Sequence, residues 1–397
     1  MTIWARNPGL RRLLVAQVPA DFADWLGYMA FTSLLAFVWQ APAVAFAWFG
    51  LALGLPYLVV GPFAGALVDR WPLRPVLVLS NLGRGLGALA MLLAPSWPWL
   101  VVIVALIGTV DSFFTPAKQA AIQALVAEED RMAANGLSGA INQSSKVLGP
   151  ALGGVLLALI GVEAIFVLSA LVSAAAAALL IGLPLPDREA GPGTTPSLLR
   201  EIGAGLRLLA QTPVLRVNIG ISAALFFTMF LYDTFFPKLF DELGLGPRLF
   251  GLAIGGVGFG AVLGSLAAGR LVRARPFLWV GGAIFLNGFG IGALGATGQD
   301  WLAIAPAALV ALFAAIGFTG AFVQVPLRTA MQNGAPPGTL ARVTALGEAA
   351  SMGALLVAPF LGAVLAASLG VGAPFLAGAA LACLLGGATL LATRRLA

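Results

Sequence analysis

Charged side chains interrupt the long apolar stretches of this sequence at a few positions, and chemistry is to be expected there. A charge at the centre of a bilayer costs about 3 kcal/mol or more, so such a residue usually faces a cavity or a partner. A carboxylate in an apolar cavity can gain and lose a proton near neutral pH, which proton coupling requires. The candidates for this role are Asp24, Asp233, Asp111 and Glu348. The alternative is a structural ion pair, such as Asp111 with Arg84 or Glu348 with Lys146.

Other kinds of chemistry find little support in the sequence. The chain has no histidine, which is the usual ligand of zinc, copper and nickel, and a single cysteine, Cys383, which cannot form an intrachain disulfide. No nucleophile–base pair and no phosphate-binding loop is visible, so we expect no enzyme, no metal site and no cofactor. The basic residues behind the net charge of +6 lie at the ends of apolar stretches, which argues against nucleic-acid binding.

The elements that carry these residues are predicted to be membrane helices. Apolar residues make up 60% of the 397 residues and charged residues only 10%, whereas soluble domains carry about a quarter charged residues. Because a transmembrane helix needs about 20 apolar residues, the apolar stretches predict an all-α membrane protein with twelve such helices. They are expected near residues 13–38, 43–68, 76–94, 99–122, 133–159, 162–183, 214–239, 249–271, 277–296, 301–327, 342–368 and 371–393.

A polar segment rich in Pro and Gly divides the predicted helices into two sets of six. We therefore expect an N-terminal six-helix bundle at 1–183, a cytoplasmic linker at 184–212 and a C-terminal six-helix bundle at 213–397. Within the linker, residues 198–209 have the pattern of an amphipathic helix at the membrane surface. Lys and Arg gather on one side of the predicted helices, which places both termini in the cytoplasm of a multi-pass protein in a bacterial inner membrane.

The two halves of the sequence resemble each other. Pro150 and Gly153 recur in the second half as Pro359 and Gly362, and segment 115–120 recurs as 325–330. Parallel repeats of six helices are typical of transporters whose substrate site lies between the halves. The repeat therefore predicts two pseudo-symmetric bundles, and the alternative is chance similarity between helices rich in Gly and Ala.

One loop motif resembles the major facilitator superfamily. The motif begins at Gly65, continues to Asp69 and Arg70 and ends with Arg74. It is similar to the superfamily's loop between helices 2 and 3, in which the acid and the arginine are implied to latch one conformation. Residues 72–73 depart from the pattern, because Pro and Leu stand where Gly and Arg are usual. The alternative is a plain basic loop on the cytoplasmic side.

A second motif, in the fifth predicted helix, consists of Gly149, Pro150, Gly153 and Gly154. It resembles the antiporter motif of the same superfamily, which implies an exporter that exchanges its substrate for protons. Its small residues and its proline predict a helix that packs closely on a partner helix. The alternative is the ordinary packing of a membrane helix.

Within the superfamily, two branches are similar to this chain. The branch of macrolide efflux proteins and the enterobactin exporter is similar to this chain at the Gly-Pro motif and in six short segments, which are 113–120, 128–130, 133–137, 197–202, 205–207 and 325–329. Residues 116–118, 134–137 and 347–348 also resemble the bacterial lysophospholipid transporter, which makes lipid translocation the second reading.

The resemblance also implies which residues line the substrate cavity, since helices 1, 4, 7 and 10 line it in this superfamily. Asp24 is the first candidate for proton coupling, because the efflux branch tends to carry an acid followed by Trp there. The cavity candidates combine aromatic rings, which suit a lipophilic cation or an amphiphile, with a few polar groups. They are Trp25, Tyr28, Phe31, Phe113, Phe230, Asn142, Lys146 and Gln324.

We therefore expect the major facilitator fold and a protein that exports an amphipathic small molecule, such as a drug or a siderophore, by proton antiport with alternating access. Its partners would be the substrate, protons and membrane lipids, and it would work as a monomer. One alternative is lysophospholipid translocation, and another is a membrane receptor or scaffold that transports nothing.

Overall fold

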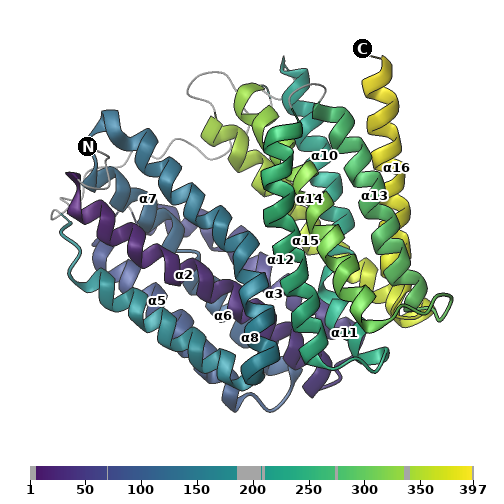
Figure 1. The fold of residues 1–397 in the computed structure, drawn as a ribbon. Coiled ribbons are helices and arrows are strands. Elements are labelled where there is room, and N and C mark those ends of the chain that lie inside the picture. The colour runs from purple at the N-terminus through teal and green to yellow at the C-terminus, as the bar shows by residue number, and fades with distance from the viewer. Residues whose placement is uncertain are drawn as a thin grey trace. The chain divides into compact units, whose positions relative to one another are not determined.

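The computed structural model of the chain describes residues 6–68, 70–185, 207, 211–272, 276–334 and 340–395. Within these residues the regular structure is helical and no strand occurs (Figure 1). Eight of the described helical stretches are long and apolar enough to cross a membrane, and two shorter apolar helices, Ala43–Val59 and Gly353–Leu369, accompany them. The helices lie where the twelve membrane helices were predicted, which confirms an all-α membrane protein. The predicted amphipathic helix falls mostly outside the described residues.

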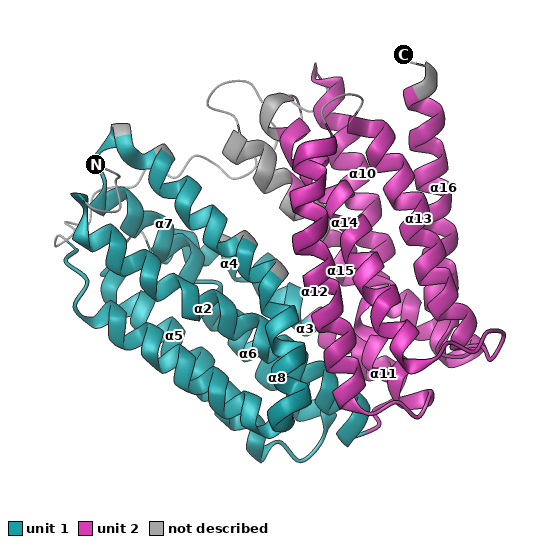
Figure 2. Ribbon diagram, in the orientation of Figure 1, with its two compact units in different colours: residues 1–39, 52–194 teal, residues 40–51, 195–397 magenta. Residues whose placement is uncertain are grey.

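Two compact units make up the chain, one of residues 1–39 and 52–194 and the other of residues 40–51 and 195–397 (Figure 2). The boundary between them falls inside one helix, because the first turns of α3 group with unit 2. Unit 1 contains α2 (Pro8–Ser33), η1 (Leu34–Val38), the later part of α3 (Ala43–Val59), α4 (Gly61–Val68), α5 (Leu73–Ala90), η2 (Met91–Leu93), α6 (Trp97–Asp111), α7 (Phe114–Leu125), η3 (Glu128–Asp130) and α8 (Arg131–Ile181). Unit 2 contains α10 (Pro213–Phe230), η4 (Asp233–Phe235), α11 (Phe236–Glu242), α12 (Pro247–Leu271), α13 (Pro276–Thr297), α14 (Pro306–Gly334), α15 (Leu340–Leu369) and α16 (Ala373–Arg395).

Local sequence signals explain several helix ends. Asn7 caps α2, since its side-chain oxygen accepts a hydrogen bond from the backbone N–H of Leu10 at 2.9 Å. The fourth predicted membrane helix is interrupted between α6 and α7, because Pro116 has no N–H to donate to the carbonyl one turn earlier. The fifth and sixth predicted helices both lie in α8, and Gly161 separates them with φ 80° and ψ 174°. A positive φ of this kind suits glycine, which has no Cβ.

The same helix pairs pack in both units, as an internal repeat requires. Helix α2 packs on α8 and α5 packs on α8 in unit 1, while α10 packs on α15 and α13 on α16 in unit 2. In the order of the twelve predicted membrane helices, the pair formed by the first and fifth thus corresponds to the pair formed by the seventh and eleventh. The pair formed by the third and sixth corresponds to the pair formed by the ninth and twelfth. Each unit also has its own core of buried apolar side chains. The predicted repeat is therefore visible in the packing of each unit.

Glycines allow some of these helices to touch through their backbones. In unit 2, Gly260 of α12 lies directly against the carbonyl of Ala314 in α14, and Gly317 of α14 lies against the carbonyl of Val257 in α12. A Cβ atom at either glycine would overlap that carbonyl. Small residues permit this close approach in membrane helices, where lipid is as apolar as the side chains.

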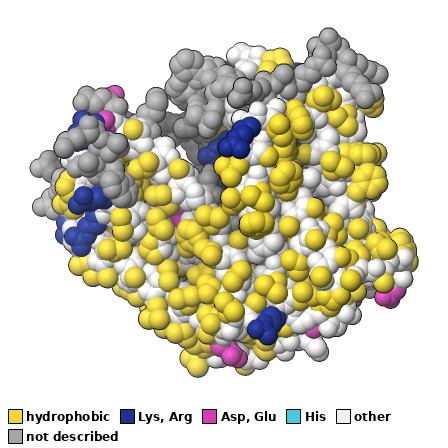
Figure 3. Space-filling view, in the orientation of Figure 1, with side chains coloured by type: hydrophobic (Ala, Val, Ile, Leu, Met, Phe, Trp, Pro, Cys, Tyr) yellow, Lys and Arg dark blue, Asp and Glu magenta, His cyan; other side chains and the backbone are white. Residues whose placement is uncertain are grey.

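Large apolar side chains also cover the outer surface of the described helices. Phe63, Leu159 and Leu384 are each at least two-thirds exposed, and Figure 3 shows hydrophobic side chains over most of the face drawn there. A soluble monomer rarely exposes such a continuous apolar surface. The surface is that of a multi-pass membrane protein, whose apolar side chains face lipid.

Candidate functional site

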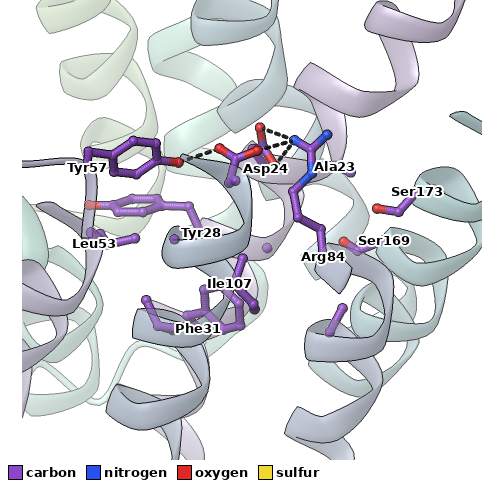
Figure 4. A pocket seen from close by; sticks show the side chains of 15 residues that line it. Ala23, Asp24, Tyr28, Phe31, Leu53, Tyr57, Arg84, Ile107, Ser169 and Ser173 are labelled. Carbon is purple, nitrogen blue, oxygen red and sulfur yellow. Dashed lines mark hydrogen bonds and ion pairs between the residues drawn. The ribbon is translucent and has the colours of Figure 1, made fainter. Parts of the chain in front are cut away.

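Two carboxylates, one guanidinium and one phenol meet inside unit 1 (Figure 4). Nη1 of Arg84 in α5 lies 2.8 and 2.9 Å from the two carboxylate oxygens of Asp24 in α2. The same Nη1 lies 3.1 Å from Oδ1 of Asp111, the last residue of α6. The Tyr57 hydroxyl of α3 donates a hydrogen bond to the other oxygen of Asp111. Four helices therefore contribute one group each to what we call the Arg84 cluster, which is Asp24, Tyr57, Arg84 and Asp111.

Arg84 is held from three sides. Its Nη2 donates to Oδ1 of Asn81 at 2.8 Å, and the Asn81 side chain in turn donates to the carbonyl of Leu77 at 2.8 Å. The guanidinium carbon also lies 4.6 Å from the centre of the Phe114 ring. An arginine with this many fixed contacts keeps its orientation, because its planar fork allows few other arrangements. Arg84 is therefore a rigid counter-ion around which the carboxylates are arranged.

The cluster borders a cavity of about 90 Å³ that lies within unit 1. The side chain of Asp24 is 41% exposed, whereas Arg84 is 4% and Asp111 is 12% exposed. Asp24 is thus the carboxylate that water reaches most easily. A cavity of this size holds a few water molecules, each of which occupies about 30 Å³. It is smaller than the roughly 300–1,000 Å³ typical of sites for drug-sized ligands. The cavity therefore suits water and protons, and it is too small for a drug-sized substrate.

The charges of the Arg84 cluster do not balance when all its groups are ionised. Two carboxylates and one guanidinium leave a net charge of −1 in surroundings from which water is largely excluded. An uncompensated charge is costly in such a place, and one proton on a carboxylate makes the cluster neutral. The geometry can therefore hold and release one proton, with Asp24 as the carboxylate most open to water.

A second polar network lies next to the first and also in unit 1. The Gln17 side chain donates to Asp21 at 2.8 Å, and Ser138 of α8 donates to Gln17 at 2.8 Å. Asn142, a predicted cavity residue, donates to the same Asp21 carboxylate at 3.3 Å. Asp21 is buried, so these donors satisfy a carboxylate that water does not reach. Asn142 thus belongs to a structural network between α2 and α8.

Phe114 links the Arg84 cluster to a buried lysine. Nζ of Lys118 lies 5.5 Å from the centre of the Phe114 ring, which also contacts Arg84. Two cations therefore face one aromatic ring, and each is attracted by the negative faces of the ring. Lys118 and Phe114 were part of the sequence resemblance, and their place beside the cluster gives that segment a physical role.

The structure brings two of the four predicted proton carriers together. Asp24 and Asp111 share Arg84, so the expected ion pair between Asp111 and Arg84 is present and Asp24 joins it. Asp233 belongs to unit 2, where it begins η4, and it does not line the cavity of unit 1. The side chain of Glu348 lies outside the described part of the structure.

The predicted aromatic cavity residues divide into two groups. Tyr28 and Phe31 line the cavity beside the Arg84 cluster. Trp25 contacts Tyr28 edge-on, with 6.0 Å between ring centres. Phe113 stacks on Trp71 and Phe230 stacks on Phe226, and neither is among the residues that line this cavity. Of the polar candidates, Lys146 and Gln324 are exposed side chains of α8 and α14.

The two sequence motifs differ in what the structure describes of them. Asp69 lies outside the described residues, and Arg70 and Arg74 are exposed. Among the described atoms, none lies within 4 Å of a Cβ placed at Gly65, so the structure shows no close helix contact at this glycine. In the second motif, by contrast, Gly149 lies against Trp25.

A Cβ built at Gly149 would lie 2.6 Å from Cβ of Trp25, and one at Gly153 would lie 3.0 Å from the Met29 side chain. Pro150 lies inside α8, and Gly154 is buried. The second motif is thus where α8 packs on α2, the helix that carries Asp24. A change in the position of α2 would be felt directly at this motif.

Tyr57 and Asn81 were missed by the sequence reasoning. Tyr57 is one of only three tyrosines in the chain, and it lies in an otherwise apolar helix. A lone hydroxyl in such a helix usually finds a polar partner, which is the signal that could have identified it. Asn81 lies three residues before Arg84 on α5, and this spacing places two side chains on one face of a helix.

Comparison with protein families and relatives places this architecture among membrane transporters. The family model of the Major Facilitator Superfamily matches residues 13–352. The uncharacterized MFS-type transporter YfiS of Bacillus subtilis (strain 168) is 27% identical over 354 residues, which cover 88% of this chain and 84% of YfiS. The enterobactin exporter EntS of Shigella flexneri is 28% identical over 302 residues, which cover 74% of this chain and 69% of EntS.

Solved structures show the same fold at lower sequence identity. A bacterial homologue of the human lysosomal transporter Spinster, in an inward-facing and unoccupied conformation, matches with a TM-score of 0.73 and 14% identity, covering 98% of this chain and 97% of that one. A bacterial homologue of the iron transporter ferroportin, in its inward-facing state, matches with a TM-score of 0.68 and 17% identity, covering 98% of this chain and 100% of that one.

Proposed function

This chain belongs to the Major Facilitator Superfamily and is a membrane transporter, and we propose that it exports an amphipathic or lipophilic small molecule of the drug or siderophore type in exchange for protons. Transport would proceed by alternating access, in a bacterial inner membrane with both termini in the cytoplasm. This proposal is supported by the similar proteins and by the chemistry of the Arg84 cluster. The siderophore class is suggested by the exporter EntS, which is similar to most of the chain.

One observation supports the proposed exchange of substrate for protons. Asp24 and Asp111 share one arginine beside a cavity that is large enough for water. In the proposed cycle, Asp24 takes up a proton from water, and the cluster changes from a net charge of −1 to neutral. Asp111 keeps its charge, because Arg84 and the Tyr57 hydroxyl both stabilise its carboxylate. Loss of the proton on the other side of the membrane would restore the charge and complete the exchange.

The link from the proton to the substrate would run through α2. Asp24 and the neighbouring Trp25 lie on consecutive positions of this helix, and Trp25 packs on Gly149 of the antiporter-like motif. When Asp24 is neutral, its attraction to Arg84 falls, since the full charge of the carboxylate is gone. We propose that the resulting shift of α2 against α8 is how protonation alters access to the substrate.

The test is efflux from proteoliposomes under an imposed pH gradient. A fluorescent lipophilic cation and an iron-free catechol siderophore are the two probes, and Asp24→Asn is compared with the parent. The control is Asp300→Asn, which makes the same change at an exposed turn with φ 58°, a conformation that Asn also tolerates. We expect gradient-driven efflux of at least one probe by the parent and by Asp300→Asn, and none by Asp24→Asn.

Other outcomes would point to the alternatives. Efflux by Asp24→Asn at the parent's rate, still driven by the gradient, would show that the proton is carried elsewhere, with Asp233 and Glu348 next to be tested. Movement of lysophospholipid that needs no gradient, without flux of either probe, would replace export by lipid translocation. Binding of a probe without flux of any kind would favour a receptor.

A further inference from the structure

Two adjacent arginines line an open groove of about 420 Å³ at one end of unit 1. The groove lies where the beginning of α2 meets the end of α8, and it is distinct from the cavity of the Arg84 cluster. Arg11 and Arg12 contribute the charge, while Val15 and Leu179 contribute apolar surface. Its volume is in the range of about 300–1,000 Å³ that is typical of small-molecule sites.

Arg12 is built into this groove by its contacts with α8. Its Nε donates a hydrogen bond to the carbonyl of Leu179, in the last turn before α8 ends at Ile181. Carbonyls in the last turn of a helix lack partners within the helix, so this contact satisfies one of them. The guanidinium also lies so close to Gly182 that a Cβ there would come within 2.6 Å of both Nη atoms. The packing therefore fixes the Arg12 charge at the edge of the groove.

Arg11 brings a second charge that the described part of the structure leaves without an acidic partner. No carboxylate among the described residues lies within 4 Å of Arg11 or Arg12, and no acidic side chain is among those that line the groove. Arg6, by contrast, pairs with Asp130 at 3.3 Å. In Figure 3, Lys and Arg side chains gather near the start of the chain, beside the broad hydrophobic surface. Among the described residues, the charged side chains that line the groove are therefore all positive.

The position of the groove along the chain indicates what kind of anion it takes. Arg11 and Arg12 come just before the first predicted membrane helix at residue 13, and Val15, which is 41% exposed, is one turn further in. A ligand in this place meets two cations at the level of the lipid headgroups and apolar side chains at the level of the acyl chains. Arginine forks match the oxygens of a phosphate group. We propose that this groove binds the headgroup of an anionic phospholipid, and that the bound lipid ties the start of α2 to the end of α8.

The internal repeat supplies a matched control for this site. Helix α10 begins in the same way as α2, with a proline in its first turn followed by Leu215 and Arg216, but Val217 stands where α2 has its second arginine. Arg216 is exposed like Arg11. Arg216→Gln therefore removes the same charge from the corresponding place in α10, where no second arginine follows.

The experiment measures the melting temperature of the purified full-length protein in a neutral detergent. Phosphatidylglycerol, phosphatidylcholine with the same acyl chains, and inorganic phosphate are each titrated into the parent, Arg11→Gln and Arg216→Gln. We expect phosphatidylglycerol to stabilise the parent and Arg216→Gln at the same midpoint concentration, and phosphatidylcholine to give no such titration. In Arg11→Gln the midpoint should rise about fivefold, since one basic side chain near anionic lipid contributes about 1 kcal/mol. Arg11→Lys, which keeps the charge but loses the guanidinium fork, should give a midpoint between those of the parent and Arg11→Gln.

Three results would overturn the proposal. The same phosphatidylglycerol midpoint in Arg11→Gln as in the parent would show that the groove does not bind the headgroup. An equal rise in midpoint for Arg216→Gln would show a general effect of surface charge. Stabilisation by inorganic phosphate equal to that by phosphatidylglycerol, and lost in Arg11→Gln, would show a site for free anions. Arg11 is exposed, so its substitution should leave the melting temperature in phosphatidylcholine unchanged. Bound phosphatidylglycerol counted by native mass spectrometry gives a second readout.

Discussion

Replacing Arg84 by glutamine tests whether the Arg84 cluster is held together by its charges. The substitution removes the only cation within 4 Å of Asp24 and Asp111 in the described structure, while both carboxylates remain. Removing one partner of a buried ion pair costs about 3–5 kcal/mol, because a buried charge is left uncompensated. The Asp24 carboxylate is 41% exposed and can be hydrated, so its part of the loss is at most about 1 kcal/mol. Most of the cost must come from Asp111, and we expect Arg84→Gln to be less stable than the parent by about 3 kcal/mol, at the lower end of the range.

Because most of the destabilisation is assigned to Asp111 and little to Asp24, the two double variants are expected to differ in stability. In the Arg84→Gln background, Asp111→Asn removes the uncompensated buried charge and should recover most of the loss. Asp24→Asn in the same background should recover much less. The loss should also shrink as the pH is lowered, because protonated carboxyl groups no longer need a cation. Stability contributed by Arg84 is thus present when the carboxylates are ionised and disappears when they are protonated.

Equilibrium unfolding in mixed micelles, at neutral and at acid pH, measures these differences in the free energy of unfolding. The expected order of stability at neutral pH is parent, then Arg84→Gln with Asp111→Asn, then Arg84→Gln with Asp24→Asn, then Arg84→Gln alone. If the variant combined with Asp111→Asn is no more stable than Arg84→Gln alone, then the charge of Asp111 is not what Arg84 compensates. In that case the electrostatic account of the cluster is wrong.

Two further predictions concern the neighbours of the cluster. Tyr57→Phe should destabilise the protein by about 1.5–3 kcal/mol at neutral pH and by less at acid pH, since it removes a hydrogen bond to an ionised carboxylate. The same unfolding assay at the two pH values measures both differences, and an equal loss at both would contradict the charge-assisted bond. Gly149→Val should cost about 1–3 kcal/mol because the new side chain overlaps Trp25. Gly139→Val on the same helix α8, where a Cβ meets nothing within 4 Å, should cost clearly less, and equal losses from the two substitutions would contradict the packing explanation.

The helices of this protein could be predicted well from its sequence, because a membrane helix is specified by its own apolar residues. The second, fourth and seventh predicted helices are each divided in the structure, α3 from α4, α6 from α7 and α10 from α11, and the sequence reasoning placed none of these breaks. The interruption between α6 and α7 has a visible cause in Pro116, although proline inside a membrane helix does not always break it, as Pro326 within α14 shows. Local sequence therefore gives the extent of a membrane helix better than its internal geometry.

The candidate site was predictable only in part, because its geometry depends on how helices are rotated about their axes. The sequence indicates that Arg84 needs an acidic partner and offers Asp111 as one, yet it does not show that Asp24 reaches the same nitrogen. Tyr57 was not predicted, because the partner of its hydroxyl is the carboxylate of Asp111, 54 residues away in the chain. The network of Asp21 and Asn142 likewise joins helices far apart in sequence. Each of these contacts joins different helices, and the periodicity of apolar residues within one helix does not predict which side chains of two helices meet.

The backbone contact between α12 and α14 has a consequence for genetic studies of this protein. Gly260 and Gly317 each lie against a carbonyl of the other helix, so every other amino acid would place a carbon atom where that carbonyl stands. Random mutagenesis screened for loss of transport will therefore recover substitutions at these codons. Such hits would report failed assembly of the unit, and they would be mistaken for substrate-binding positions unless the amount of folded protein in the membrane is measured alongside.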